Sequence, residues 1–164
     1  MIFSGNPAFS RLLIISGGQT GVDRAALDAA LEMGVPCAGW CPEGRVAEDG
    51  VIDARYPLTE LPGGGSVDRT RANVRDSDGT LVLLSGEPDD GTRLTIDAAL
   101  SLERPVLVVD VGCSDPAEER DRIRTWLAAN EVCRLNVAGP RESNAPGIYT
   151  RAKALIDALL SAMK

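Results

Sequence analysis

The stretch Ser16-Gly17-Gly18-Gln19-Thr20-Gly21-Val22-Asp23-Arg24 joins an apolar run, Leu12–Ile15, to a helical pattern at Val22–Met33. A short apolar strand, a glycine-rich turn and a helix in direct succession are typical of the first half of a βαβ unit. Gly34 follows the last apolar position of the helix, where a left-handed glycine commonly ends one. The stretch therefore predicts an α/β fold that starts at the first strand.

Along the rest of the chain, further short apolar runs alternate with helical patterns. Runs that are apolar throughout indicate strands covered on both faces, as in a parallel sheet between two helix layers. The predicted strands are Leu12–Ile15, Pro36–Trp40, Leu81–Leu84, Val106–Val109 and Leu135–Ala138. The predicted helices are Val22–Met33, 67–76, Thr92–Leu102, Pro116–Ala129 and Ile148–Met163. We expect residues 1–164 to form one doubly wound, Rossmann-like three-layer α/β/α domain with a mainly parallel five-stranded sheet.

The sequence also gives expectations for the strand order, the longest loop and one helix start. The first strand should be central, and the strand orders 2-1-3-4-5 and 3-2-1-4-5 both agree with the pattern. Residues 41–66 form the longest irregular stretch, with Gly63-Gly64-Gly65 as a flexible connector. Asp115 as N-cap and Pro116 in the first turn, with Glu118 after them, predict the start of the fourth helix.

Composition excludes several classes of function. The net charge of −7 disfavours nucleic-acid binding, which normally needs a basic face. The first apolar run is too short for a signal peptide or a membrane span, so we expect a cytoplasmic protein without a membrane partner. The sequence contains no histidine, which removes imidazole from any mechanism and from any metal site.

The cysteines do not form a familiar metal motif. Cys37 and Cys41 are separated by three residues, and neither Cys113 nor Cys133 belongs to a second pair of that kind. We expect a buried Cys37, a loop Cys41 and no metal site.

The first strand-to-helix loop has the features of an anion site. Gly17 and Gly18 allow positive φ angles and a close approach of the backbone to a ligand. Gln19, Thr20 and Gly21 lead into the helix, where unpaired N–H groups and the helix dipole favour an anion. Arg24, one turn further on, can add a bidentate phosphate contact. The loop is neither the dinucleotide fingerprint nor a P-loop, and a tight turn without a ligand is the alternative.

Two later loops follow strands of the same predicted sheet. Gly91 and Thr92 place a glycine and a hydroxyl at the start of a helix. In 136–144, Gly139-Pro140 fixes a turn from which Arg141 can project, and Ser143 or Asn144 can cap the last helix. A capping turn with a solvated arginine is the alternative for this third loop.

Two polar segments have open interpretations. Residues 40–50 include Glu48 and either recognise a ligand or form a solvated loop. In 69–76, Arg69, Asn73 and Asp76 share one helical face, which either lines an anion pocket or belongs to a charged surface helix. The candidate ligand-binding residues are Gly17, Gly18, Gln19, Thr20, Gly21, Arg24, Asn73, Arg75, Gly91, Thr92, Asn136, Gly139 and Arg141.

Four motifs in this order resemble the molybdenum-cofactor carrier family, over about residues 12–160. They are Gly17-Gly18-Gln19-Thr20-Gly21-Val22-Asp23-Arg24-Ala25, the segment 39–50, Asn73-Val74-Arg75-Asp76-Ser77-Asp78-Gly79-Thr80, and the segment 135–143. The resemblance implies a Rossmann-like fold related to the lysine-decarboxylase-like nucleoside monophosphate phosphoribohydrolases. It also implies a homo-oligomer, either a dimer or a tetramer, whose carried ligand is molybdenum cofactor.

Three functions agree with these residues. The first is a non-enzymatic carrier that holds molybdenum cofactor through backbone N–H groups and Arg24, Arg75 or Arg141, without a cysteine–metal bond. The second is a phosphoribohydrolase, in which Asp23 or Glu48 would be the catalytic carboxylate. The hydrolase motif Pro-Gly-Gly-x-Gly-Thr-x-x-Glu is absent, which argues against this activity. The third is a nucleotide-sensing module that acts through a separate partner.

Overall fold

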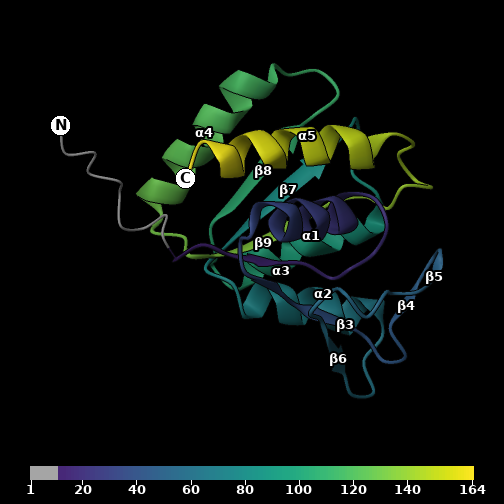
Figure 1. Cartoon of the computed structure of the whole chain (residues 1–164). Helices are drawn as coiled ribbons and strands as arrows, with labels where there is room; N and C mark the ends of the chain where they lie inside the picture. The colour runs from purple at the N-terminus through teal and green to yellow at the C-terminus, as the bar shows by residue number, and fades with distance from the viewer. Residues whose placement is uncertain (1–10) are drawn as a thin grey trace.

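The structure is a computed structural model that describes residues 11–164. In this range five helices flank a five-stranded parallel sheet, which is the Rossmann-like α/β arrangement expected (Figure 1). The sheet strands are β1 (Leu13–Ile15), β2 (Cys37–Ala38), β7 (Gly79–Leu84), β8 (Val106–Asp110) and β9 (Arg134–Ala138). The helices are α1 (Val22–Met33), α2 (Ser66–Arg75), α3 (Asp90–Ser101), α4 (Pro116–Ala129) and α5 (Ile148–Ser161).

The helices form one layer on each face of the sheet. α1, α5 and α4 pack side by side on one face, and α2 and α3 pack together on the other (Figure 1). The main core lies between the sheet and the first layer. There Ile14, Leu81 and Leu135 have no exposed surface, and neither do four alanines of α1. Because these alanines recur at helical spacing and are small, α5 packs directly on α1.

The strand order differs from both expected orders. It is β2-β1-β9-β7-β8, so the last strand is central and the first strand lies beside it. β9 pairs in parallel with β1 through Ile14↔Leu135 and with β7 through Leu81↔Val137. The sequence did not reveal this strand order because all three strands carry buried apolar residues. Such residues indicate that helices cover both faces of a strand, but they do not indicate which strands lie beside it. If β9 is counted as the first strand, the order becomes the doubly wound 3-2-1-4-5.

The segment predicted as irregular contains four short strands. β3 (Trp40–Pro42) pairs in parallel with β6 (Thr59–Leu61), and β4 (Val46–Ala47) pairs antiparallel with β5 (Gly50–Val51). The guanidinium of Arg45 holds the intervening chain by donating to backbone carbonyls. The four acceptors are Ile52, Asp53, Tyr56 and Leu58. This segment, residues 40–61, is called the excursion below.

The predicted strand Pro36–Trp40 is divided at Gly39, which has a φ of 150° and whose missing Cβ leaves room for the carbonyl of Ser16. The expected buried position of Cys37 and loop position of Cys41 were also wrong. Cys41 is fully buried in β3, whereas Cys37 is half-buried, because the excursion folds back over α1 and covers Cys41.

Helix starts agree with the sequence at α4 and differ at α3 and α5. Asp115 caps α4 by accepting from Ala117 N at 2.8 Å. At α3 the N-cap is Asp89, which accepts from Thr92 N at 2.8 Å, so Thr92 lies inside the first turn. At α5 the carboxylate of Glu142, rather than Ser143 or Asn144, accepts from Gly147 N at 2.6 Å and Tyr149 N at 3.0 Å.

Among the helices of residues 11–164, none combines the length and the apolar character needed to cross a bilayer.

Candidate functional site

A polar cavity lies at the carboxyl edge of the sheet, beside the ends of β1, β9 and β7. Its volume is about 270 Å³. α5, which follows β9, packs on one face of the sheet, and α3, which follows β7, packs on the other. The sheet therefore has a topological switch point between β9 and β7, and ligands of doubly wound folds bind at such points. We call it the edge cavity. Its lining residues are Gly17, Gln19, Asp23, Arg69, Thr70, Asn73, Asp89, Asp90, Gly91, Thr95, Asn136, Ala138, Gly139, Arg141 and Asn144.

The structure brings about half of the sequence-predicted residues into this cavity. The candidates that line it are Gly17, Gln19, Asn73, Gly91, Asn136, Gly139 and Arg141, together with the carboxylate candidate Asp23. The candidates outside the lining are Gly18, Thr20, Gly21, Arg24, Arg75 and Thr92, together with the carboxylate candidate Glu48.

The glycine-rich loop is built differently from a simple phosphate cradle. Gly18 has a φ of 78°, but Gly17 has no positive φ, and the space of its missing Cβ is filled by the guanidinium of Arg69. Several backbone N–H groups of the loop already donate hydrogen bonds to side chains of this protein. Gly18 N donates to Ser16 Oγ, Gln19 N to Asp23 Oδ2 and Thr20 N to Gln19 Oε1, at 3.0–3.3 Å.

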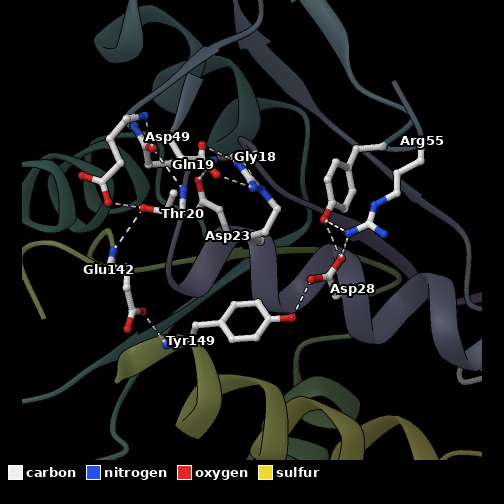
Figure 2. A network of polar contacts seen from close by, with 12 residues as sticks. Gly18, Gln19, Thr20, Asp23, Asp28, Asp49, Arg55, Glu142 and Tyr149 are labelled. Carbon is white, nitrogen blue, oxygen red and sulfur yellow. Dashed lines mark hydrogen bonds and ion pairs between the residues drawn. The ribbon is translucent and has the colours of Figure 1, made fainter. Parts of the chain in front are cut away.

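The end of this loop is covered by the loop after β9. A Cβ on Gly21 would meet the backbone of Pro140–Glu142, and Val22 N donates to the Pro140 carbonyl at 3.4 Å. Figure 2 shows Thr20 pointing to Glu142, whose N–H donates to the Thr20 hydroxyl at 3.2 Å. Thr20 and Gly21 therefore join two loops.

Asp23 and Arg69 form the wall of the cavity between α1 and α2. Arg69 Nη1 lies 3.0 Å from Asp23 Oδ2, and the two side chains are 13% and 5% exposed. Burial raises the pKa of Asp23 above its ordinary value, while the neighbouring Arg69 opposes this shift. The sequence indicated an Arg/Asn face on this helix, but it did not indicate that Asp23 would lie opposite.

Glu48 connects three loops rather than facing the cavity. Its carboxylate accepts from Thr20 Oγ1, from Ser143 Oγ at 2.5 Å and from Ser143 N at 3.2 Å, and Arg141 Nη1 lies 3.9 Å away. The Ser143 and Thr20 hydrogen bonds lower the pKa of Glu48. Glu48 is therefore an ionised acceptor that holds the excursion against the loops after β1 and β9.

Two of the predicted arginines have protein partners away from the cavity. Arg24 Nη1 donates to Asp49 at 3.0 Å, and its Nε donates to the carbonyl of Gly18 at 3.2 Å (Figure 2 shows Gly18 and Asp49). Arg75 binds Asp76 through Nε at 2.8 Å and Nη2 at 2.9 Å. In these positions both arginines fix the local structure.

The buried amides have different roles. Asn73 is 3% exposed and forms two hydrogen bonds with the backbone of Trp40, at 2.8 and 2.9 Å, so it ties α2 to the excursion. Asn136, 2% exposed in β9, donates to Thr80 Oγ1 at 3.3 Å. Gly139 is required directly after β9, where the chain passes the Leu83 carbonyl, because a Cβ there would overlap that oxygen.

Sequence reasoning missed several lining residues around α2 and α3. Asp89 accepts from Thr92 N and from Asn144 Nδ2, both at 2.8 Å, and these hydrogen bonds lower its pKa against the effect of burial. The adjacent Asp90 is fully exposed at the rim. Residues 89–92, Asp-Asp-Gly-Thr, form a recognisable helix start. This pattern could have indicated that Asp89 and Asp90 lie at the carboxyl edge of the sheet. The residues missed are Thr70, Asp89, Asp90, Thr95, Ala138 and Asn144, whereas Arg69 lies on the helical face for which an anion pocket was one of two interpretations.

A second polar cluster stabilises the outer side of α1. Asp28 accepts from the hydroxyls of Tyr56 and Tyr149, both at 2.6 Å, and Arg55 Nη2 donates to the Tyr56 hydroxyl at 2.6 Å. Figure 2 shows Asp28 between Arg55 and Tyr149. Because these residues come from α1, the excursion and α5, the cluster fixes the excursion on the helix layer.

Comparison with known proteins gives two matches. Residues 14–160 match the family described as "Circularly permutated YpsA SLOG family". A solved structure described as "Putative molybdenum carrier protein" from Syntrophus aciditrophicus SB is 39% identical, with a TM-score of 0.89, and the match covers 92% of this chain and 96% of that chain. No curated protein matches the chain. A circular permutation agrees with the sheet, in which the central strand comes last in the sequence.

Proposed function

Since the chain belongs to the circularly permutated YpsA SLOG family, we propose that it binds a small phosphate-bearing ligand in the edge cavity and acts as a carrier of molybdenum cofactor. The description of the solved relative supports this choice of cargo. The edge cavity supports the choice of site, because it combines a switch-point position with two arginines, Arg69 and Arg141.

The lining suits such a ligand in kind and in size. The guanidinium groups of Arg69 and Arg141 match phosphate oxygens, and the amides of Asn136 and Asn144 match heterocycle donors and acceptors. The volume of about 270 Å³ is just below the ~300–1,000 Å³ typical of small-molecule pockets. The cavity therefore accommodates a compact ligand, or the phosphate end of a longer one.

No cysteine is among the lining residues, so the cargo would be held by hydrogen bonds and charge. Such contacts are reversible, and a carrier has to release its cargo to an acceptor.

The alternative is a phosphoribohydrolase that cleaves an N-glycosidic bond. This reaction needs a carboxylate that reaches the substrate. Of the two carboxylates expected from the sequence, Glu48 is occupied by Thr20 and Ser143 outside the lining, and Asp23 is the one that lines the cavity. Asp23 Oδ2 already accepts hydrogen bonds from Arg69 Nη1 and Gln19 N, so this carboxylate is part of the cavity wall, which favours binding over hydrolysis.

The test is native mass spectrometry with calorimetric titration, using molybdenum cofactor under anaerobic conditions and AMP as the comparison ligand. A carrier binds the cofactor tightly without changing it and binds AMP weakly. Release of adenine from AMP, abolished in Asp23→Ala, would establish the hydrolase instead. The same spectra report whether the chain forms the homo-oligomer that the family resemblance implies.

A matched pair of variants tests the site itself. Arg141→Ala removes a lining charge, whereas Arg151→Ala removes an exposed charge on α5. We expect only Arg141→Ala to weaken binding, by about tenfold for one charged hydrogen bond. Equal affinities in both variants would place the ligand elsewhere.

A further inference from the structure

Arg69 uses only a small part of its hydrogen-bonding capacity. A guanidinium has five N–H donors, and in the described residues a single one, on Nη1, is bonded, to Asp23 Oδ2 at 3.0 Å. Its Nε is buried without a partner among those residues. Buried donors are normally satisfied, so an arginine in a cavity wall with open donors points to an anion.

The position of Arg69 is fixed by its surroundings. Its guanidinium lies over Gly17, in the space that a Cβ there would occupy, so the first loop accommodates the arginine. The side chain is 13% exposed, and its helix also contributes Thr70 and Asn73 to the cavity. The guanidinium is therefore held at the cavity wall before any ligand arrives.

We propose that Arg69 receives the anionic group of the ligand, and that the carboxyl group of Asp23 takes up a proton as this anion arrives. The inference rests on the proposed function and specifies how the cavity recognises a phosphate-like group.

The proton follows from the charge balance of the pair. Asp23 is 4% exposed, and its carboxylate has one cationic hydrogen-bond partner, Arg69. An anion on the same guanidinium adds a like charge close to a buried carboxylate and competes for its counter-ion, which favours the neutral form of Asp23. Burial already raises the pKa of Asp23 in the absence of an anion.

Few other charged groups near Asp23 can oppose the protonation that a bound anion favours. The charged groups near the Asp23 carboxylate or in the same cavity are Arg69 from α2, Arg24 on α1 itself, Arg141 from the loop after β9, and Asp89 and Asp90 at the start of α3. Arg24 is paired with Asp49, and Arg141 lies 3.9 Å from Glu48. The proton comes from solvent to a carboxylate oxygen of Asp23, at most one per bound anion, so binding strengthens as the pH falls through the range where Asp23 titrates.

The experiment is calorimetric titration of the full chain with AMP and, anaerobically, with molybdenum cofactor. Titrations at pH 6 in buffers with different ionisation enthalpies give the number of protons taken up on binding. The phosphate of the ligand also titrates near this pH and can itself take up or release protons on binding. The wild type is therefore compared with Asp23→Asn, because the phosphate contributes equally to the proton count in both proteins. We expect greater proton uptake by the wild type, and tighter binding by Asp23→Asn at pH 7.

The role of Arg69 is tested with a matched control on the same helix. Arg69→Ala should weaken binding by about ten- to a hundredfold, which corresponds to the loss of charged hydrogen bonds. Arg71→Ala, on a face of α2 outside the cavity lining, should leave the affinity unchanged. If Arg69→Ala leaves Asp23 unpaired and does not fold, the double variant Asp23→Asn with Arg69→Met removes both charges, and it should bind weakly with no excess proton uptake.

The outcomes separate this inference from the proposed function. Wild-type protein that binds neither AMP nor the cofactor overturns the proposed function and this inference together. Binding that is equal in wild type and in a folded Arg69 variant overturns the role of Arg69 alone. Binding with the same proton count in wild type and Asp23→Asn overturns the proton uptake.

Discussion

The carbonyl oxygen of Pro140 occupies the space that a Cβ atom on Gly21 would need, and the amide of Val22 donates to that same oxygen at 3.4 Å. Gly21 also has a φ of 78°. The start of α1 and the loop after β9 are therefore in contact only because position 21 has no side chain. This contact joins the loops after β1 and β9, and both loops contribute other residues to the lining of the edge cavity.

Gly21→Ala should destabilise the fold by roughly 3 kcal/mol, from the disallowed backbone conformation and the overlap with Pro140. Gly34→Ala is the control, because Gly34 has a φ of 68° and no atom within 4 Å of its Cβ position. That variant should lose only about 1–2 kcal/mol, the left-handed conformational cost. Urea unfolding of both variants measures the difference, and equal losses would show that Pro140 moves aside.

Arg45→Lys should loosen the excursion. A lysine cannot reach the four carbonyls that the planar guanidinium of Arg45 binds at 2.8–3.1 Å. Three of these hydrogen bonds are partly buried, and each lost one costs about 1 kcal/mol. We expect faster amide hydrogen exchange across residues 46–58 and a moderate loss of stability. Arg93→Lys, at an exposed contact of 3.7 Å with Asp90, is the comparison and should change neither quantity. Unchanged exchange in Arg45→Lys would mean that the excursion is held by its strands.

The sequence predicted the elements of this fold better than their arrangement. α1 and α4 have the predicted bounds because their starts and ends carry strong local signals, such as the Asp115 cap and Gly34. The insertion of β9 between β1 and β7 has no local signal, since Leu135 and Val137 would be buried equally well at several sheet positions.

The site shows the same division. The glycines at 17 and 139 were recognised as special, but the groups that require them are Arg69 and the Leu83 carbonyl, which are distant in sequence. Arg24 was a reasonable phosphate candidate one turn into α1, yet Asp49 from the excursion binds it. Pairings of this kind depend on the tertiary fold, so spacing along one element cannot predict them.

Asp76 should make the stability of the protein depend on pH in the acid range. Arg75, burial and the Trp40 indole N–H together set the pKa of Asp76 at about 2, below its ordinary 3.8, with the hydrogen bonds from Arg75 and Trp40 outweighing burial. Because the folded pKa is the lower one, the stabilisation is present above about pH 4 and is lost as the pH falls toward 2. The side chain is 33% exposed, so we expect only about 1 kcal/mol.

This prediction is measured by comparing wild type with Asp76→Asn in urea unfolding at pH 6, 4 and 2. The difference between the two proteins should shrink as the pH falls. In a Trp126→Phe background the fluorescence of Trp40, whose Nε1 lies 2.7 Å from Asp76 Oδ2, should change over the same pH range. A difference between the proteins that is constant with pH would contradict the assigned pKa.

Glu48→Ala should weaken ligand binding through the loops rather than through the loss of a reacting group. Without this carboxylate, Thr20 and Ser143 lose a shared acceptor and Arg141 loses a neighbouring counter-charge at 3.9 Å. We expect faster hydrogen exchange in residues 140–144 and a decrease in affinity of several-fold. Glu118→Ala, at an exposed position on α4, is the control and should leave both unchanged. If instead Glu48→Ala abolished a measured hydrolysis of AMP while exchange in 140–144 stayed as in the wild type, Glu48 would act on the substrate, and the connecting role given to it here would be wrong.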